Sequence, residues 1–135
     1  MQDYFDICVK HNITPILSLV AIKNHKLLYI EDNISEDEAM VIRDFLLECD
    51  IKTNPKNIVK ELIVVDCGMS DECLSYILEG LLSQQYHSKV KNETFNYLET
   101  FVYKNNSFGS KSMPLLQKMM PNLFQFCMTN VDGLG

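Results

Sequence analysis

This 135-residue chain lacks the sequence features that are typical of membrane proteins, of metal sites and of phosphate-binding enzymes. It contains no apolar run long enough to cross a bilayer, and its first residues have neither the basic region nor the apolar core of a signal peptide. Its histidines, His11, His25 and His87, are far apart, and it contains no Cys-x2-Cys, His-Glu-x2-His or glycine-rich phosphate-binding motif. The sequence therefore predicts no membrane association, no metal site, no cofactor and no enzymatic activity.

Basic residues are also scarce. The chain has 12 Lys and Arg residues against 18 Asp and Glu residues, which gives a formal net charge of −6 at pH 7. This balance argues against a nucleic-acid backbone or an anionic membrane as the main partner. The five cysteines are an odd number and are scattered along the chain, at Cys8, Cys49, Cys67, Cys73 and Cys127. Such a pattern favours buried thiols in a reducing compartment, and hence a cytoplasmic location.

The chain does contain a repeat. Three stretches carry apolar residues at the same six places, at offsets 0, 2, 7, 12, 15 and 19 from the first. The first two places alternate as in a strand, and the last three follow the spacing of one helix face, so each unit is predicted to be strand, turn and helix. The apolar places are Leu27, Tyr29, Ile34, Ala39, Ile42 and Leu46; Leu62, Val64, Met69, Leu74, Ile77 and Leu81; and Phe101, Tyr103, Phe108, Met113, Leu116 and Met120.

Polar residues mark the predicted helix starts. Ser35 to Glu38 reads as a capping box, and Ser70 followed by Asp71 and Glu72 offers an N-cap with acids in the first turn. Gly109-Ser110 marks the boundary in the third unit. Because the carboxylates recur at the same place in successive units, capping explains them better than a general acid and base pair does.

The units resemble the leucine-rich repeat, whose signature is L-x-x-L-x-L-x-x-N/C-x-L. The segments 59–69 and 98–108 fit this signature, with Cys67 and Asn106 at the Asn/Cys place, whereas the first unit has Asp32 there and is atypical. The resemblance is to the ribonuclease-inhibitor-like subclass. It implies an α/β solenoid, with a short curved parallel sheet and outer helices, over residues 25–135. The array comprises about three repeats and the start of a fourth.

Residues 1–24 lie outside the repeat and are predicted to form an N-terminal helical cap. One helix is expected around Tyr4 and Cys8, and a second from Ile16 to Ile22, with Thr14 and Pro15 at its start. The order Tyr4-x3-Cys8-x6-Pro15 is similar to the opening of a group of eukaryotic leucine-rich repeat proteins associated with cilia and centrosomes. This resemblance implies a ciliary, axonemal or centrosomal assembly.

The polar segments between units are expected to project as loops. They run from Cys49 to Asn57 and from Gln84 to Asn96, and each follows a predicted helix. Insertions at such places cost little closure entropy. They are interpreted as neutral loops, with partner-contact loops as the alternative.

The candidate binding surface is the strand face that points away from the helices. The places between the predicted core residues combine an apolar column with an acidic one. We predict a partner-binding surface there, since contiguous exposed apolar residues mark interfaces. The alternatives are that these residues merely suit strands or that the N-terminal cap covers them. The predicted binding residues are Leu28, Ile30, Ile63, Val65, Asp66, Val102 and Lys104.

Two functions remain open from the sequence. The first is a non-catalytic protein–protein interaction module, which acts as a scaffold or structural subunit of a larger assembly. The second is a regulator that binds and blocks a partner enzyme, as relatives of the ribonuclease inhibitor do. The scaffold is favoured because the array is too short to wrap around an enzyme.

The end of the repeat also carries a prediction. A fourth strand is expected from Leu123 to Met128, with no helix and no polar cap after it. The strand edge and the apolar face of the third helix, formed by Met113, Leu116 and Met120, are then expected to be open. Either further repeats or a neighbouring protein should cover this end.

Overall fold

The computed structural model describes residues 2–15, 26–47 and 58–132. Helices and strands alternate along most of this length. In chain order they are α1 (Gln2–His11), β1 (Leu27–Ile30), α3 (Glu36–Leu47), β2 (Glu61–Val65), α4 (Asp71–Leu82), β3 (Gln85–Ser88), β4 (Glu93–Asn96), β5 (Thr100–Lys104), α5 (Met113–Met119), the 3-10 helix η3 (Met120–Asn122) and β6 (Gln125–Thr129).

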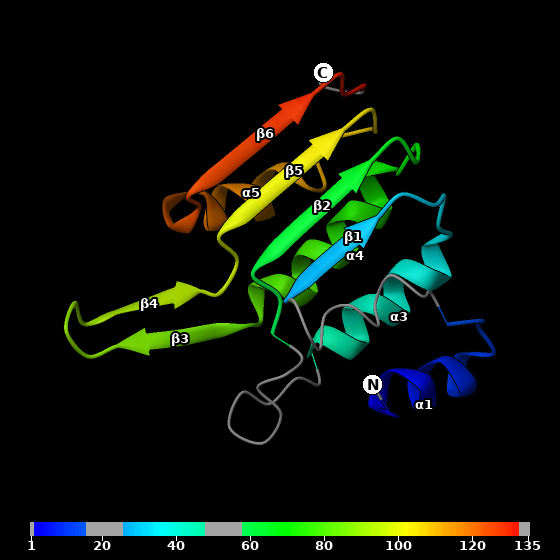
Figure 1. Ribbon diagram of the computed structural model, residues 1–135, viewed down its shortest axis with the longest axis horizontal. Coiled ribbons are helices and arrows are strands. Elements are labelled where there is room, and N and C mark those ends of the chain that lie inside the picture. The colour runs from blue at the N-terminus through cyan, green and yellow to red at the C-terminus, as the bar shows by residue number, and fades with distance from the viewer. Residues whose placement is uncertain (1, 16–25, 48–57, 133–135) are drawn as a thin grey trace.

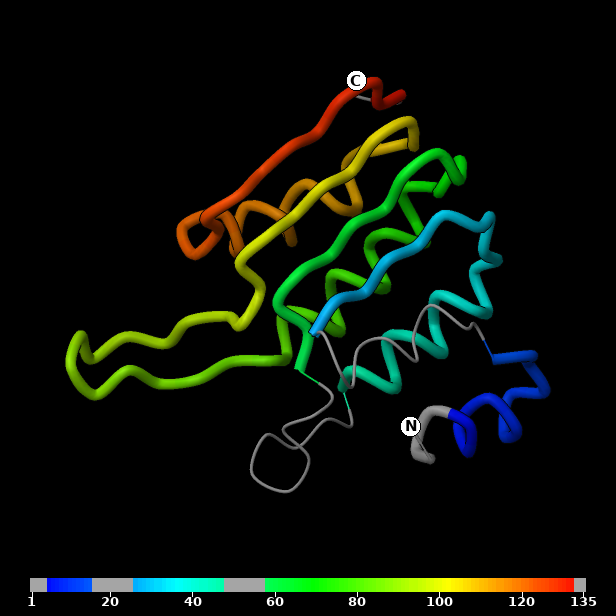
Figure 2. The backbone as a smooth tube through the Cα atoms, viewed as in Figure 1, coloured from blue at the N-terminus to red at the C-terminus, as the bar shows by residue number. Residues whose placement is uncertain are grey.

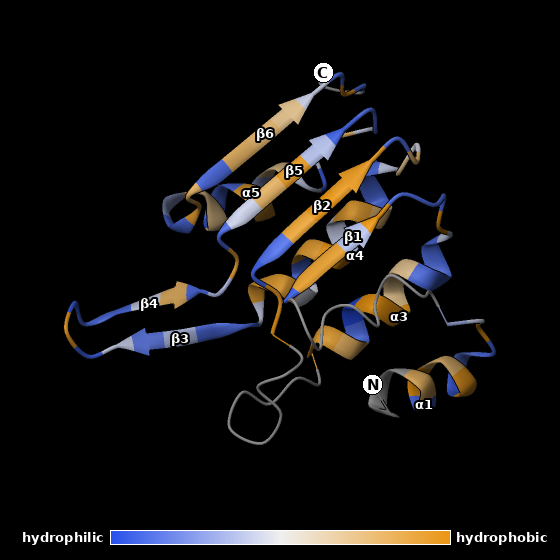
Figure 3. Ribbon diagram, in the orientation of Figure 1, coloured by the Kyte–Doolittle hydropathy of each residue, from blue (hydrophilic) through white to orange (hydrophobic). Residues whose placement is uncertain are grey.

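The fold is an α/β arrangement built on one parallel sheet. Strands β1, β2, β5 and β6 are neighbours in that order, and every pair is parallel. The helices α3, α4 and α5 connect successive strands and all lie on one face of the sheet (Figure 1). Hydrophobic residues dominate β1, β2 and α4 (Figure 3). The predicted parallel sheet with helices on one side is therefore confirmed.

The backbone repeats from unit to unit. The carbonyl of Lys26 accepts hydrogen bonds from the N–H groups of Lys60 and Glu61. The carbonyl of Lys60 accepts in the same way from Glu99 and Thr100. A carbonyl that accepts two hydrogen bonds from the next strand therefore precedes both β1 and β2, and these bonds align the starts of β1, β2 and β5.

The register of the first strand differs from the prediction. Leu28 pairs with Leu62 and Ile30 with Val64, and all four side chains are buried, whereas Leu27 and Tyr29 are partly exposed. The predicted helix positions of this unit, Ala39, Ile42 and Leu46, are all buried. However, three residues separate Ile30 from Ile34 where four separate Val64 from Met69. This shorter turn shifts the strand by one residue, and such a shift exchanges its two faces.

The third helix also differs from the prediction. Met113 and Met120, which share the predicted apolar face with Leu116, are 40% and 43% exposed, in line with the expectation that this end is open. Leu116 is buried, and the second buried residue of α5 is Met119, which was not predicted. The reason lies at the start of α5, where the buried hydroxyl of Ser112 donates to the main-chain oxygen of Asp71 at 2.9 Å and orients the first turn.

Asn106 and Cys67 occupy the turn that follows the strands, as predicted. Asn106 is 3% exposed, and its side-chain oxygen accepts from the N–H of Met69 at 3.0 Å and from the Cys67 thiol at 3.2 Å. Its amide nitrogen donates to the carbonyls of Val64 and Lys104, at 3.1 and 2.7 Å. The prediction for Asn106 is confirmed. Cys67 is buried as expected, with Asn106 as the partner of its thiol.

The segment from Gln84 to Asn96 was predicted to be a loop, and this is wrong. It forms an antiparallel hairpin, β3 paired with β4, which extends away from the main sheet (Figure 1). Both faces of this two-stranded ribbon are exposed to solvent. Its strands therefore do not need the alternation of apolar and polar residues by which strands are recognised in a sequence. The other predicted loop, Cys49 to Asn57, lies outside the described residues.

The N-terminal helix forms where expected. Helix α1 packs beside α3, at the side of the helix layer (Figure 2). Ile7 and Cys8 of this helix are buried, and the His11 imidazole lies 3.7 Å from the Asp44 carboxylate. The second predicted helix, Ile16 to Ile22, lies outside the described residues. No helix in the described part of the chain is long and apolar enough to cross a membrane.

Candidate functional site

A continuous column of side chains crosses the face of the sheet that is opposite to the helices. The register places Tyr29, Ile63, Val102 and Cys127 side by side on β1, β2, β5 and β6. All four are partly exposed. They point away from the core because their neighbours along each strand, such as Leu62 and Val64, face the helices. We call these four residues the open-face column.

Five of the seven predicted binding residues belong to this side of the sheet. Ile63 and Val102 are in the open-face column, and Val65 and Lys104 are paired one step further along β2 and β5. Asp66 follows directly after β2 and is exposed. Leu28 and Ile30 do not join them, because the shifted register of β1 buries both, at 0% and 1% exposure. Tyr29 occupies the predicted place of Leu28.

The sequence reasoning missed a polar ladder beside the column. Asp66, Asn105 and Asn130 follow the ends of β2, β5 and β6, and all three have left-handed backbone, with φ of 53°, 60° and 53°. The Asn105 amide donates to the Asp66 carboxylate, and the Asn130 amide donates to the Asn105 side-chain oxygen at 2.5 Å. Asn and Asp tolerate this conformation better than other non-glycine residues. Their recurrence at the same place was the available signal.

The described part of the N-terminal cap does not cover the open-face column. Helix α1 contacts α3, which lies on the opposite side of the sheet (Figure 2). In Figure 1, no described helix lies over the viewer's side of β1, β2, β5 and β6. Among the described elements, the sheet is therefore covered on one face only.

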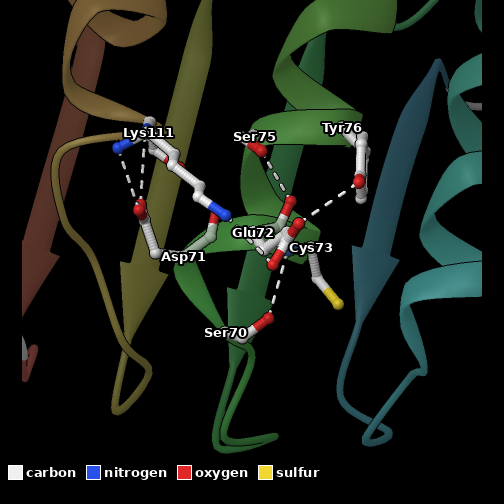
Figure 4. Close-up of polar contacts among 8 residues, drawn as sticks. Ser70, Asp71, Glu72, Cys73, Ser75, Tyr76 and Lys111 are labelled. Atoms are coloured by element: carbon white, nitrogen blue, oxygen red, sulfur yellow. Dashed lines mark hydrogen bonds and ion pairs between the residues drawn. The ribbon is translucent and has the colours of Figure 1, made fainter.

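Polar side chains at the starts of α3 and α4 act as caps. Ser35 and Glu38 form a reciprocal capping box, with N–H to side-chain oxygen distances of 3.0 and 3.2 Å. Ser70 accepts from the N–H of Cys73 at 3.1 Å (Figure 4). These bonds satisfy helix N–H groups that have no partner within the helix. The predicted capping role is confirmed for both serines.

Asp71, the first residue of α4, binds the segment that precedes α5. Its carboxylate accepts hydrogen bonds from the N–H groups of Gly109, Lys111 and Ser112, at 2.8, 2.9 and 3.2 Å. Burial alone would raise the pKa of Asp71, but these hydrogen bonds to the charged form outweigh it and lower the pKa. The sequence had marked Gly109-Ser110 as the helix boundary. The helix begins only at Met113, because Asp71 holds the residues before it.

A chain of ionisable groups lies beside these caps, on the helix side of the molecule. Lys111 Nζ is 3.1 Å from Glu72 Oε2, and the Tyr76 hydroxyl donates to Glu72 at 3.3 Å (Figure 4). The hydrogen bond from Lys111 lowers the pKa of Glu72, while the hydrogen bond with Glu72 raises the pKa of Glu36. The carboxyl groups of Glu36 and Glu72 and the ammonium group of Lys111 are accessible to solvent. Their interaction therefore links neighbouring helix starts at the surface.

The thiols of the core are placed for packing. Burial raises the pKa of both Cys67 and Cys73, which keeps them protonated at neutral pH. The Cys73 thiol donates to the carbonyl of Ile34 at 3.8 Å. Within the described residues no group of three or more His, Cys, Asp or Glu side chains could hold a metal ion.

The open-face column thus presents apolar and sulfur atoms beside a polar ladder. No protein-family model matches this chain, and no curated protein or solved structure matches it.

Proposed function

We propose that the protein is a non-catalytic protein–protein interaction module of the leucine-rich repeat type, in the ribonuclease-inhibitor-like subclass. It would serve as a scaffold or structural subunit of a larger assembly. The sequential parallel strands, the α-helix found in each crossover and the buried Asn106 of the turn support this assignment. The resemblance of Tyr4-x3-Cys8-x6-Pro15 to ciliary and centrosomal proteins favours an axonemal or centrosomal assembly.

The observation that carries the proposal is the open-face column. Tyr29, Ile63 and Val102 form a contiguous apolar strip on rigid strands, and none of the described helices covers it. Strands hold side chains in fixed positions without the entropy cost of ordering a loop on binding. A strip of this kind supports recognition of a partner protein better than it supports catalysis, which needs converging polar groups.

The test is a single substitution on the column. Ile63→Asp places a carboxylate on the partly exposed face of β2, so the fold should survive while partner contact is lost. Cross-linking mass spectrometry in cell extract identifies the partner of the unchanged chain, and the same experiment is repeated with the variant. Gln117→Asp, on the exposed side of α5, is the matched control and should retain the partner.

Circular dichroism of each variant separates loss of binding from loss of fold. Val64→Asp, which buries a charge at a fully enclosed position, should unfold the domain and calibrates that measurement. A folded Ile63→Asp variant that still captures the same partner would remove the open-face column from consideration.

A further inference from the structure

Carboxylates gather at one end of the open face. Glu31 directly follows β1 and accepts a hydrogen bond from the Tyr29 hydroxyl at 3.3 Å. Asp32 comes next in the chain, and Asp66 directly follows β2, the neighbouring strand. All three acidic residues are exposed. Because β1 and β2 are parallel, their ends meet at the same edge of the sheet, and the acidic residues gather there next to Tyr29.

Two of these carboxylates act on Tyr29. Desolvation raises the pKa of the Tyr29 hydroxyl, and the carboxylates of Glu31 and Asp66 raise it further. Neither carboxylate forms an ion pair with a described residue. Asp66 accepts from the Asn105 amide, which carries no charge. A protonated phenol therefore lies near two carboxylates that lack a counter-ion in the described part of the chain. We call Tyr29, Glu31 and Asp66 the acidic corner.

The lysines of these strands do not neutralise the acidic corner. Lys26 and Lys60 precede β1 and β2, at the opposite ends of the strands. Lys104 ends β5 and is exposed, and the register places it beside Val65. Its ammonium forms no ion pair with a described carboxylate. The three carboxylates that follow β1 and β2, taken with the Lys104 ammonium, leave a net charge of −2 at this edge.

An arginine side chain suits the acidic corner better than a lysine does. A guanidinium group stacks on aromatic rings and donates in a planar fork to carboxylates, whereas an ammonium group is a compact point charge. The partly exposed Tyr29 offers the ring, and Glu31 and Asp66 offer the acceptor oxygens. A bound cation would also lower the repulsion between these two carboxylates.

We propose that the open-face column binds a segment of a partner protein that places an arginine in the acidic corner and an apolar side chain on Ile63 and Val102. This rests on the proposed function, since it specifies the chemistry of the partner that the column recognises. Ile63 and Val102 follow Tyr29 across the sheet, and neighbouring strands lie about 4.8 Å apart. The arginine and the apolar side chain therefore contact the sheet within about 10 Å of each other.

The probe is a synthetic peptide in which one tryptophan and two leucines are flanked by two arginines. This chain contains no tryptophan, so tryptophan emission reports on the peptide alone. Titration with the full 135-residue chain should shift the emission to the blue as the tryptophan ring leaves water. A peptide with glutamates in place of the arginines should bind at least about tenfold more weakly, and a peptide with lysines should lie between the two.

Four variants locate the bound arginine. Glu31→Gln and Asp66→Asn remove one charge each but keep a hydrogen-bond acceptor, and each should weaken binding of the arginine peptide about fivefold or more. Lys104→Gln removes a cation from the same face and should strengthen binding about twofold. Glu93→Gln, at an exposed position of the hairpin, is the matched control and should leave the affinity unchanged.

Three results would overturn the arginine site. They are absence of binding, equal binding of the arginine and glutamate peptides, and a loss of affinity in Glu93→Gln that equals the loss in Glu31→Gln. None of them decides the proposed function, which fails when a folded Ile63→Asp variant still captures its partner from cell extract. All four variant positions of the peptide experiment are exposed, so circular dichroism should match that of the unchanged chain.

Discussion

At the scale of single residues, Asn106 joins two units with one amide. Its oxygen serves the N–H of Met69 and the thiol of Cys67 in the preceding unit, while its nitrogen serves the carbonyls of Val64 and Lys104. No apolar side chain of similar size could satisfy these groups. The position therefore requires an amide, and this is why the role of Asn106 in the turn could be predicted from the sequence.

Replacing Asn106 with Leu should lower the free energy of unfolding by about 1–3 kcal/mol, because the N–H and C=O groups of the turn lose their partners. Urea unfolding followed by circular dichroism measures the change. Gln117→Leu, an amide replaced on the exposed side of α5, is the control and should be close to neutral. Equal stability of the two variants would contradict the role given to Asn106.

The second residue-scale prediction concerns Asp71 and pH. Its pKa is lowered in the folded state, so its contribution to stability is present above the unfolded pKa of about 3.9 and is lost as the pH falls below it. Asp71→Asn should destabilise the protein by about 1–3 kcal/mol at pH 7, since the amide accepts the three N–H bonds poorly. At pH 3 the difference from the unchanged chain should shrink. Urea unfolding at both pH values is the measurement, and a difference that is the same at both would contradict it.

At the scale of helices and strands, the apolar spacing predicts which segments form the helices and strands of the repeat, but it does not predict the register of every strand. It predicted β2 and α4 in full, because all six apolar places from Leu62 to Leu81 are buried. It failed where turn length changed. The turn after β1 is one residue shorter, and this exchanges the faces on which Leu28 and Tyr29 lie. The spacing of apolar residues in the following helix is unchanged, so it gives no sign of the shift.

The apolar spacing in the sequence predicts neither the hairpin nor the close contact between α3 and α4. Gly80 lies in the last turn of α4, where a Cβ would come within 2.9 Å of the Leu46 Cβ and 3.2 Å of the Arg43 Cα. A glycine inside a helix costs about 0.5–1 kcal/mol relative to alanine. Here the missing side chain lets α3 and α4 approach, and only the packed structure reveals that need.

Gly80→Ala should therefore destabilise the domain by about 1–3 kcal/mol, despite the better helix propensity of alanine, because α3 must move away from α4. Thermal unfolding measures the loss. Glu79→Ala at the adjacent, exposed position is the control and should change stability by less than about 1 kcal/mol, since it removes only a surface ion pair with Arg43 at 3.7 Å. A stabilising Gly80→Ala would show that the helices can separate freely.

At the scale of the whole molecule, the candidate site depends on which face each strand presents. The sequence placed Ile63, Val65, Val102 and Lys104 on the open side, and the structure agrees. It did not place Tyr29 there, because the register of β1 is shifted by one residue. The predicted fourth strand does leave Cys127 between Phe126 and Met128, and the register of β6 agrees with that spacing.

The edge of the sheet leads to the last prediction. Among the described strands, β6 pairs with β5 alone, and its sequence, Gln-Phe-Cys-Met-Thr, carries no charge that would repel a second copy. Phe126 stacks on Phe101 at 5.7 Å and is 43% exposed, because no described helix covers it. Unpaired edges of this kind pair with another chain.

The 135-residue chain should therefore associate with itself through β6 unless a neighbouring protein covers the edge. Sedimentation equilibrium should show an apparent mass that rises with concentration toward twice that of one chain. Lysine is the residue by which natural edges resist pairing, so combined Phe126→Lys and Thr129→Lys substitutions should restore the mass of a single chain. Val90→Lys, at a hairpin position that is 96% exposed, adds the same charge elsewhere and should leave the association unchanged. A single-chain mass for the unchanged protein at every concentration would mean that β6 closes without a partner.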